Sequence, residues 1–530
     1  MKTFRRFRRK EEQDDSESDI KGLLPDPSIV RVGEDYYLVN STFEWWPGVR
    51  LWHSKDLVNW EQLPSPLNRV SQLDMLGDPT SGGIWAPDLT YDGKRFYLVF
   101  TDVKTKKGRY YNNHNYVVWA DSIYGPWSEP VYLNSTGFDP SMLHDTDGRK
   151  YVVNMRNGFK GVLVQEYDPV SQKLIGEVRN VFRGTKIGFT EGPHIYHIGE
   201  WYYCLVAEGG TGYGHCVTMA RSKSIWGPYE VDPENPMATS DQDNPELLQK
   251  CGHGDLVETP DGEWYLVHLC ARPPKGKKRC LLGRETGIQK VYWNEEGWLR
   301  LTSGGRIAQN ETEGPSGGEA ALLPTAPESG KDDFDSPELG VRYSIPRVPL
   351  GDKISFTERP GWLRLYGQES LNSLHHVSLV AVRQTEYHAY AQTCMEFDPA
   401  CPEQLAGLAY MYDAANFYLF GKIREDDGRQ MLTVVKSDWL AVTDEIDPIP
   451  LPEGKRIWLR IETDGETARC LYSLDGENFT DTGARLDTEL LTDEHCRGFT
   501  GAHFGMYCHD MTGKHLYADF DSFDCYCSPM

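Results

Sequence analysis

The segment GEDYYLVNS, residues 33–41, decides the fold because four close copies of its pattern follow in the first half of the chain. Each copy begins with a glycine-containing turn and continues as a run of aromatic and β-branched residues, which is typical of a strand that follows a hairpin turn. The other copies are YDGKRFYLVFT (91–101), TDGRKYVVNM (146–155), IGEWYYCLVAE (198–208) and PDGEWYLVHL (260–269). Their spacing fits one propeller blade per copy, so the repeats predict a five-bladed β-propeller.

A second pattern follows three of these copies and resembles an outer strand, a turn and a Trp or Tyr anchor. It reads HSKDLVNWEQ (53–62), ADSIYGPWSEP (120–130) and ARSKSIWGPYE (220–230). Long helical periodicity is absent from this half of the chain. The two patterns together indicate units of short antiparallel strands, which is an all-β fold class.

The composition changes near residue 310, where residues 309–331 are rich in Gly, Pro, Ser and Glu and are typical of a linker. Beyond it, stretches such as HAYAQTCMEF (388–397) and IWLRIET (457–463) alternate in polarity between frequent turns, which predicts a β-sandwich of the jelly-roll or lectin-like kind. We therefore expect a charged, disordered tail at 1–21, a propeller at 22–308, a linker at 309–331 and a sandwich at 332–530.

The charge balance excludes several classes of partner. The formal net charge is −24, which argues against binding to nucleic acid or to an anionic membrane. No run of about 18 apolar residues is present, so nothing predicts a membrane span. The basic and then acidic N-terminal tail lacks the apolar stretch of a secretory signal, and the twelve cysteines have no C-x-x-C spacing. We expect reduced thiols and a cytoplasmic protein.

Counting back from the repeated tyrosine of each copy leads to residues of an unusual kind. Asp26 lies eleven residues before Tyr37, and the residues twelve before the other four tyrosines are Trp85, Asp139, Glu191 and His253. Equivalent positions on the innermost strands of a propeller converge on one end of its axis. The count therefore predicts one shared position per blade, which gathers three carboxyl groups, an indole and an imidazole in one funnel.

Carboxylates that lie close together repel one another, so a ring of this kind destabilises the fold. Its presence therefore indicates a functional site. Each acid also has an ordinary structural explanation, since Asp26 and Asp139 precede proline, where Asp often begins a turn, and Glu191 precedes Gly-Pro. Their shared register favours catalysis. For His253, within GHGD, a metal ligand and a buried histidine that bonds backbone or water both remain open.

Eight stretches after residue 22 resemble one enzyme family, the β-xylosidases of glycoside hydrolase family 43, in the branch with a C-terminal β-sandwich. They are PDPSIVRVGEDYYLVNSTFEWWPGVRLWHSKDLVNW (25–60), SGGIWAPDLTYDGKRFYLVFTDVK (81–104), GFDPSMLHDTDGRKYVVNM (137–155), TEGPHIY (190–196), AEGGTGYGH (207–215), GHGDLVETPDGEWYLVHL (252–269), LGRETGIQKV (282–291) and GFTGAHFGMYCHDMTGKHLYADFDSF (498–523). The chain departs from the family in its long charged tail and in Leu23 and Leu24, which stand where Gly-Phe-Asn is common.

The resemblance implies roles for individual residues. Asp26 resembles the general base, Glu191 the general acid, and Asp139 the residue that raises the pKa of the acid and helps to hold the sugar. The implied substrate-binding residues are Phe43, Trp85, Phe138, Thr211, His253, Arg284 and, from the sandwich, Phe499. Phe499 would close the pocket from outside, and a pocket closed in this way would release single sugars.

The implied activity is inverting, exo-acting release of xylose from β-1,4-xylooligosaccharides, with α-L-arabinofuranosidase side activity. Inversion leaves room for a water molecule, which requires the two carboxyl groups to lie about 6.5–9.5 Å apart. The resemblance implies no required cofactor, although Ca²⁺ near His253 is an option, and it implies a homo-oligomer, either a dimer or a tetramer. Two alternatives stay open: a primary α-L-arabinofuranosidase, and a non-catalytic sugar-binding propeller.

Overall fold

The computed structural model describes residues 21–106, 111–274, 276–315 and 329–528, and within these ranges the regular secondary structure is almost entirely β-strand. The expected disordered tail therefore lies almost wholly outside the described residues. The helix α1 (Asp493–Cys496) is a single turn. No helix in the described ranges has the length and apolar character that crossing a bilayer requires.

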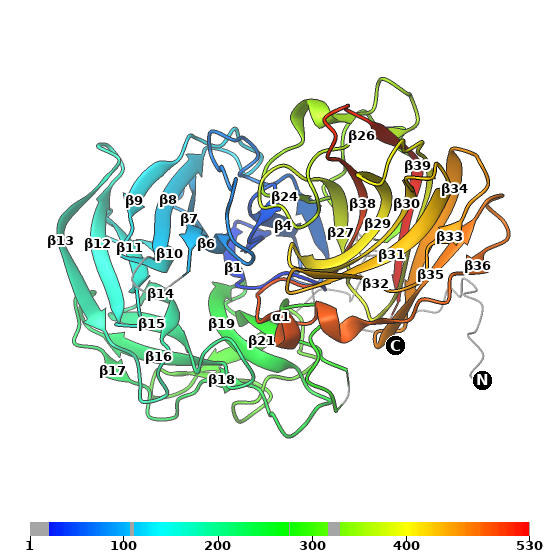
Figure 1. Cartoon of the computed structure of the whole chain (residues 1–530). Helices are drawn as coiled ribbons and strands as arrows, with labels where there is room; N and C mark the ends of the chain where they lie inside the picture. The colour runs from blue at the N-terminus through cyan, green and yellow to red at the C-terminus, as the bar shows by residue number, and fades with distance from the viewer. Residues whose placement is uncertain (1–20, 107–110, 275, 316–328, 529–530) are drawn as a thin grey trace.

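The first half forms five antiparallel sheets arranged around an axis, so the five-bladed propeller predicted from the repeats is confirmed (Figure 1). The first blade contains β1 (Ser28–Val32), β2 (Asp35–Asn40), β4 (Arg50–Ser54) and β5 (Trp60–Leu63). The second contains β6 (Gly83–Tyr91), β7 (Phe96–Thr105), β8 (Asn112–Ala120) and β9 (Val131–Asn134). The third contains β10 (Gly137–His144), β11 (Lys150–Arg156), β12 (Val162–Asp168) and β13 (Lys173–Phe182).

The last two blades follow the same order. The fourth contains β14 (Glu191–Ile198), β15 (Trp201–Glu208), β16 (Cys216–Ser222) and β17 (Glu230–Val231), with β18 (Ala238–Thr239) also beside β16. The fifth contains β19 (Gln249–Glu258), β20 (Trp264–Ala271), β21 (Glu285–Trp293) and β22 (Leu299–Leu301). The ring closes where β1 meets β19, and there the amide of Ile29 donates to Asp255 Oδ2 at 2.8 Å.

The repeated aromatic segments are the second strands of the blades, and their tyrosines pack between neighbouring blades. Tyr97, Tyr151, Tyr203 and Tyr265 are each at most 4% exposed, and each belongs to a separate apolar cluster that joins two adjacent blades. Burial of this apolar surface stabilises the contact between blades. In these four blades the tyrosine therefore recurs because each needs the same contact with the next blade.

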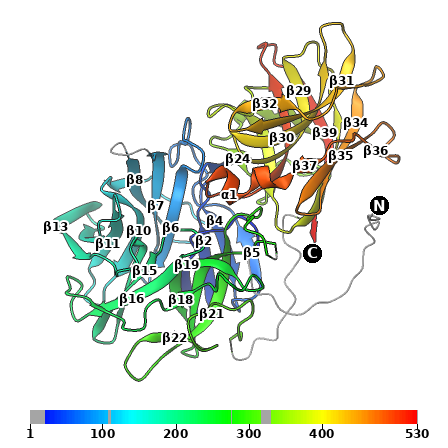
Figure 2. The same cartoon turned by 60° about the horizontal axis from the view of Figure 1, so that its bottom comes forward.

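The second half is a β-sandwich, as predicted (Figures 1 and 2). One sheet has the order β25 (Ile354–Ser355), β26 (Leu363–Tyr366), β39 (Tyr517–Ser528), β28 (His388–Glu396), β34 (Arg456–Thr463), β35 (Thr467–Ser473) and β36 (Thr480–Asp481), with β23 (Gly330–Asp332) beside β39 and β37 (Leu486–Asp487) beside β35. The other has the order β27 (Ser378–Arg383), β38 (His503–Asp510), β29 (Gln404–Asp413), β30 (Asn416–Arg424), β31 (Gln430–Asp438) and β32 (Ala441–Asp444), with β33 (Ile449–Pro450) beside β31.

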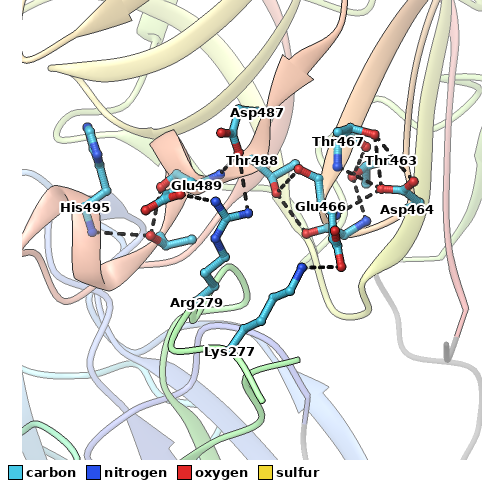
Figure 3. Close-up of polar contacts among 12 residues, drawn as sticks. Lys277, Arg279, Thr463, Asp464, Glu466, Thr467, Asp487, Thr488, Glu489 and His495 are labelled. Atoms are coloured by element: carbon cyan, nitrogen blue, oxygen red, sulfur yellow. Dashed lines mark hydrogen bonds and ion pairs between the residues drawn. The ribbon is translucent and has the colours of Figure 1, made fainter. Parts of the chain in front are cut away.

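The two domains are joined by strand pairing, by a shared core and by ion pairs. β24 (Ile345–Pro346), which lies between β23 and β25 in the chain, pairs with β3 (Trp45–Trp46), which lies between β2 and β4 of the first blade. One apolar cluster contains residues of both domains. Figure 3 shows Lys277 and Arg279, from a propeller loop, contacting Glu466, Asp487 and Glu489 of the sandwich. The helix α1 lies at this junction in both views (Figures 1 and 2). A sandwich residue can therefore reach the axis of the propeller.

Candidate active site

One narrow pocket gathers all ten side chains that the sequence nominates. The space open to the centre of a water molecule is about 50 Å³. The lining residues are Asp26, Phe43, Trp85, Phe138, Asp139, Glu191, Thr211, His253, Arg284 and Phe499. Nine come from the propeller and Phe499 comes from the sandwich.

The prediction that one position per blade supplies these side chains is wrong for Trp85 and Glu191. The repeated tyrosines pair with Val30, Thr90, Leu143, Tyr196 and Val257 on the innermost strands. Four residues before each of these partners stand Asp26, Ala86, Asp139, Gly192 and His253, and all five have positive φ, from 30° to 54°. Trp85 and Glu191 each precede that position by one residue.

The error comes from the hairpins that join the first and second strands of the blades. The tyrosine follows its partner by eight residues in the third and fifth blades, but by seven in the other three. In the last four blades the strand pairing is also interrupted at this point, as in a β-bulge, which re-aims side chains. The pocket therefore draws on two adjacent positions: the positive-φ residue in three blades, and the residue before it in three.

Asp26 is oriented by a hydroxyl group that the sequence analysis did not nominate. Ser41 Oγ donates to Asp26 Oδ2 at 2.7 Å and accepts the amide of Ala86 at 2.7 Å, so its proton is directed at the carboxylate. The other oxygen, Asp26 Oδ1, lies 3.5 Å from His253 Nδ1 and 3.8 Å from Arg284 Nη1. Burial lowers the pKa of His253 to about 4, so this imidazole is neutral near pH 7.

The other two carboxyl groups resist ionisation. Burial, and then the charge of Asp26, raises the pKa of Asp139 to about 8, although the amide of Gly192 donates to Asp139 Oδ2 at 3.0 Å. Burial, followed by the charges of Asp139 and Asp26, raises the pKa of Glu191 well above its ordinary value, and Arg284 opposes this shift. No described residue is shown donating to the Glu191 carboxyl group, so the pocket favours a proton on Glu191.

Arg284 connects the two domains at the pocket. Its Nη1 donates to Thr211 Oγ1 at 2.7 Å, and its Nη2 donates to the carbonyl oxygen of Phe499 at 3.2 Å. Its buried Nε has no hydrogen-bond partner among the described residues. A buried donor without a partner is costly, so Arg284 is held in the pocket lining at some cost in stability.

The aromatic walls continue beyond the predicted pocket. Ring centroids are 5.9 Å apart for Phe43 and Phe499, 5.5 Å for Trp85 and Phe499, and 5.7 Å for Trp85 and Phe138. Phe159 then lies 5.8 Å from Phe138, and Phe189 lies 5.5 Å from Phe159. Phe159 and Phe189 are 39% and 61% exposed. Sequence reasoning missed both, because neither belongs to a repeat; each is a lone aromatic residue directly after a glycine.

A second polar layer lies two residues further along the innermost strands. Asp88, His194 and Asp255 place their ligand atoms within 4.8 Å of one another. Ser28 and the amide of Met142 donate to Asp88, while Tyr196 and the amide of Ile29 donate to Asp255. Ca²⁺ takes six to eight oxygen ligands. The carboxylates of Asp88 and Asp255 already accept hydrogen bonds from protein groups, so this cluster does not by itself fit calcium. The option of Ca²⁺ near His253 stays a prediction.

Comparisons with known proteins agree with this geometry. A model described as glycosyl hydrolases family 43 matches residues 20–299, and one described as beta xylosidase C-terminal Concanavalin A-like domain matches residues 331–525. The chain is 44% identical to xylosidase/arabinosidase 43B of Humicola insolens, covering 95% of this chain and 96% of that one. It is 43% identical to a beta-xylosidase of Bacillus subtilis, covering 95% and 98%. The crystal structure of a xylan beta-1,4-xylosidase from Bacillus halodurans is 47% identical, with a TM-score of 0.91 over 95% of this chain and 98% of that one.

Proposed function

The chain belongs to glycosyl hydrolase family 43 and is a glycoside hydrolase, and from that premise we propose that it releases single D-xylose units from the non-reducing ends of β-1,4-xylooligosaccharides with inversion at the anomeric carbon. The observation that carries this proposal is the pocket that joins Asp26, Asp139 and Glu191 to aromatic walls from two domains. Sugar binding alone does not require a carboxyl group with a raised pKa, whereas proton donation by Glu191 does.

Glu191 and Asp26 divide the proton transfers between them. Glu191, kept protonated by burial and by its acidic neighbours, gives its proton to the glycosidic oxygen as the bond to the anomeric carbon breaks. Asp26, oriented by Ser41, takes a proton from the water molecule whose oxygen forms the new bond on the opposite face. Glu191 ends ionised and Asp26 ends protonated, so the two groups must exchange one proton with solvent before the next cycle. No step passes through a metal ion.

The pocket favours a single pentose. Its narrow space is bounded by Trp85 and Phe138 on the propeller side and by Phe499 on the sandwich side. Xylose lacks the exocyclic hydroxymethyl group of a hexose, which these walls would exclude by steric clash. Arg284, which lines the pocket, would donate to a hydroxyl group of the sugar. An enclosed pocket of this kind supports release of terminal units instead of cleavage within a chain.

Arabinofuranoside cleavage is a proposed side activity. An α-L-arabinofuranosyl group has an outline similar to that of xylopyranose, and the Humicola insolens relative is named xylosidase/arabinosidase. The kcat/KM values for nitrophenyl xyloside and nitrophenyl arabinofuranoside, measured on one preparation, separate this proposal from a primary arabinofuranosidase.

Proton NMR of xylobiose hydrolysis tests the main proposal. The first-formed xylose should carry the α-anomeric signal, because attack on the opposite face inverts a β-linkage. Initial β-xylose in excess of the share that the reducing-end unit of xylobiose contributes would overturn the inverting mechanism. Binding of xylobiose without any cleavage would support the scaffold alternative.

The variant Asp139→Asn is expected to move the basic limb of the pH profile to lower pH. The rate falls as pH rises through the pKa of Glu191, because the acid then loses its proton. The charge of Asp139 is the second cause of that raised pKa, after burial, so its removal lowers the pKa only in part. The measurement is kcat/KM for xylobiose against pH. The acidic limb should move less, and an unchanged basic limb would show that Asp139 holds the sugar without tuning Glu191.

Phe189→Ala is expected to weaken binding of the leaving part of the substrate. The path of rings from Phe138 through Phe159 to Phe189 leads from the pocket to exposed surface, where a second sugar would stack. Loss of one stacking contact should raise KM for xylotriose about two- to tenfold. The inhibition constant of free xylose in the pocket should stay unchanged. Equal effects on xylotriose and xylose would remove Phe189 from the leaving-group side.

A further inference from the structure

Ser81 lies outside the pocket lining, yet each of its polar atoms is bonded to a group next to the pocket. It is 1% exposed and precedes β6. Its amide donates to Glu44 Oε2 at 2.9 Å, and Glu44 follows the wall residue Phe43. Its carbonyl oxygen accepts the indole Nε1 of Trp85 at 2.9 Å. Its hydroxyl oxygen accepts the amide of Phe499 at 2.9 Å.

The bond to Phe499 crosses between the domains. The amide of Phe499 is bound by Ser81 beside the second blade, and its carbonyl oxygen is bound by Arg284 beside the fifth blade. The backbone of Phe499 is therefore fixed from both sides by propeller groups. Ser81 also forms a hydrogen bond to a second aromatic wall, since its carbonyl oxygen accepts the indole N–H of Trp85.

The backbone at Ser81 separates the role of its hydroxyl group from that of its main chain. Ser81 has a φ of +54°, a left-handed conformation that glycine adopts more readily than serine. Glycine could supply the same carbonyl oxygen and amide with less strain. The one group that glycine could not supply is the hydroxyl that accepts the amide of Phe499.

The sandwich leaves room for the Ser81–Phe499 hydrogen bond because residue 498 is a glycine. A Cβ atom on Gly498 would lie 2.9 Å from Ser81 Oγ and 2.7 Å from the ring of Tyr412, so any side chain at 498 would force these groups apart. Lys106 adds a support at the same point. Its Nζ donates to the carbonyl oxygens of Thr80 and Ser81 at 2.8 and 3.3 Å, and it lies 5.2 Å from the ring centroid of Phe499.

We propose that Ser81 is a positioning residue that sets the distance between Trp85 and Phe499, and so fixes the width of the sugar pocket across the domain boundary. The two rings meet edge to face, with centroids 5.5 Å apart and planes at 80°. A shift of Phe499 opens the outer wall without touching the carboxyl groups that transfer protons. The inference rests on the proposed function for the identity of the sugar, but not for the contact itself.

The test compares Ser81→Ala and Ser81→Gly with the neighbouring control Thr80→Ala, whose hydroxyl has no bond to a pocket wall. Both Ser81 variants leave the amide of Phe499 without its acceptor. KM for xylobiose and the inhibition constant of D-xylose should rise together, about five- to tenfold, while kcat falls less than about threefold. Thr80→Ala should match the parent in all three constants. Ser81→Gly should melt at or above the temperature of Ser81→Ala, because it relieves the left-handed backbone.

Each outcome decides a separate point. Parent-like KM in Ser81→Gly, with a raised KM only in Ser81→Ala, would show a backbone role and overturn the proposal. A lower kcat and a lower melting temperature, with KM unchanged, would also overturn the proposal. Gly498→Ala approaches the same contact from the sandwich and should reproduce the raised KM. If the parent protein neither binds xylose nor cleaves xylosides, the proposed function fails. A parent enzyme that is active and indifferent to Ser81 refutes this inference alone.

Discussion

Asp26→Ala is expected to lower kcat for xylobiose by about 10³-fold, within the range that a positioned general base contributes. The pocket directs one oxygen of Asp26 to Ser41 and leaves the other near His253 and Arg284. The other two carboxyl groups that line the pocket are poor substitutes for this base, since burial and neighbouring charges raise the pKa of both Asp139 and Glu191. The measurement is the initial rate on xylobiose at saturating substrate.

Asp26→Asn is the matched control for this prediction. The amide oxygen can still accept from Ser41, so the fold of the pocket is retained while the basic group is lost. We expect nearly the same loss as in Asp26→Ala. A substrate with an activated leaving group should restore neither variant, because activation of water is still missing. A variant that keeps a tenth or more of the parent rate would remove Asp26 from the role of base.

The fold was predictable because its determinants are local and repeated. A glycine turn followed by an aromatic strand occurs in every blade, and four of the five repeated tyrosines pack in equivalent clusters between adjacent blades. Alternating strands such as β34, which buries Ile457, Leu459 and Ile461, likewise indicate a sheet with one covered face. Patterns of this kind record secondary structure and burial directly.

The identity of the pocket residues was predictable, but their exact register was not. Counting back from the tyrosines assigned five residues to one shared position. In the structure Asp26, Asp139 and His253 occupy the position with positive φ, and Trp85 and Glu191 precede it by one residue. The count failed because a one-residue difference in hairpin length cannot be separated from a shift of register in the sequence alone. A β-bulge then allows both positions to face the axis.

The tertiary contacts that position the pocket residues gave no signal in the sequence. Ser81 and Phe499 are 418 positions apart, and nothing in SGGIWAPD or GFTGAHF indicates that they are bonded. Ser41 likewise follows a strand repeat and resembles any polar residue at a strand end. The Ser81–Phe499 bond depends on how the two domains dock, and Ser41 depends on the packing of two propeller blades, so neither contact follows from a local pattern.

Glu191→Ala is expected to lower kcat for xylobiose by about 10²- to 10⁴-fold and to abolish the basic limb of its pH profile. The leaving xylose is a poor leaving group, so it departs only when its oxygen receives a proton. Glu191 supplies that proton because burial and the charges of Asp139 and Asp26 hold its pKa well above the ordinary value.

The response to a better leaving group distinguishes Glu191→Ala from Asp26→Ala. Dinitrophenyl xyloside releases an anion that needs no proton, so Glu191→Ala should recover most of its loss on this substrate, while Asp26→Ala should recover none. The measurement is the ratio of the two kcat values, dinitrophenyl xyloside to xylobiose, in each variant and in the parent. The ratio should rise by orders of magnitude only in Glu191→Ala. Equal ratios in the two variants would show that Glu191 does not protonate the leaving oxygen, and the division of labour between the two acids would then be wrong.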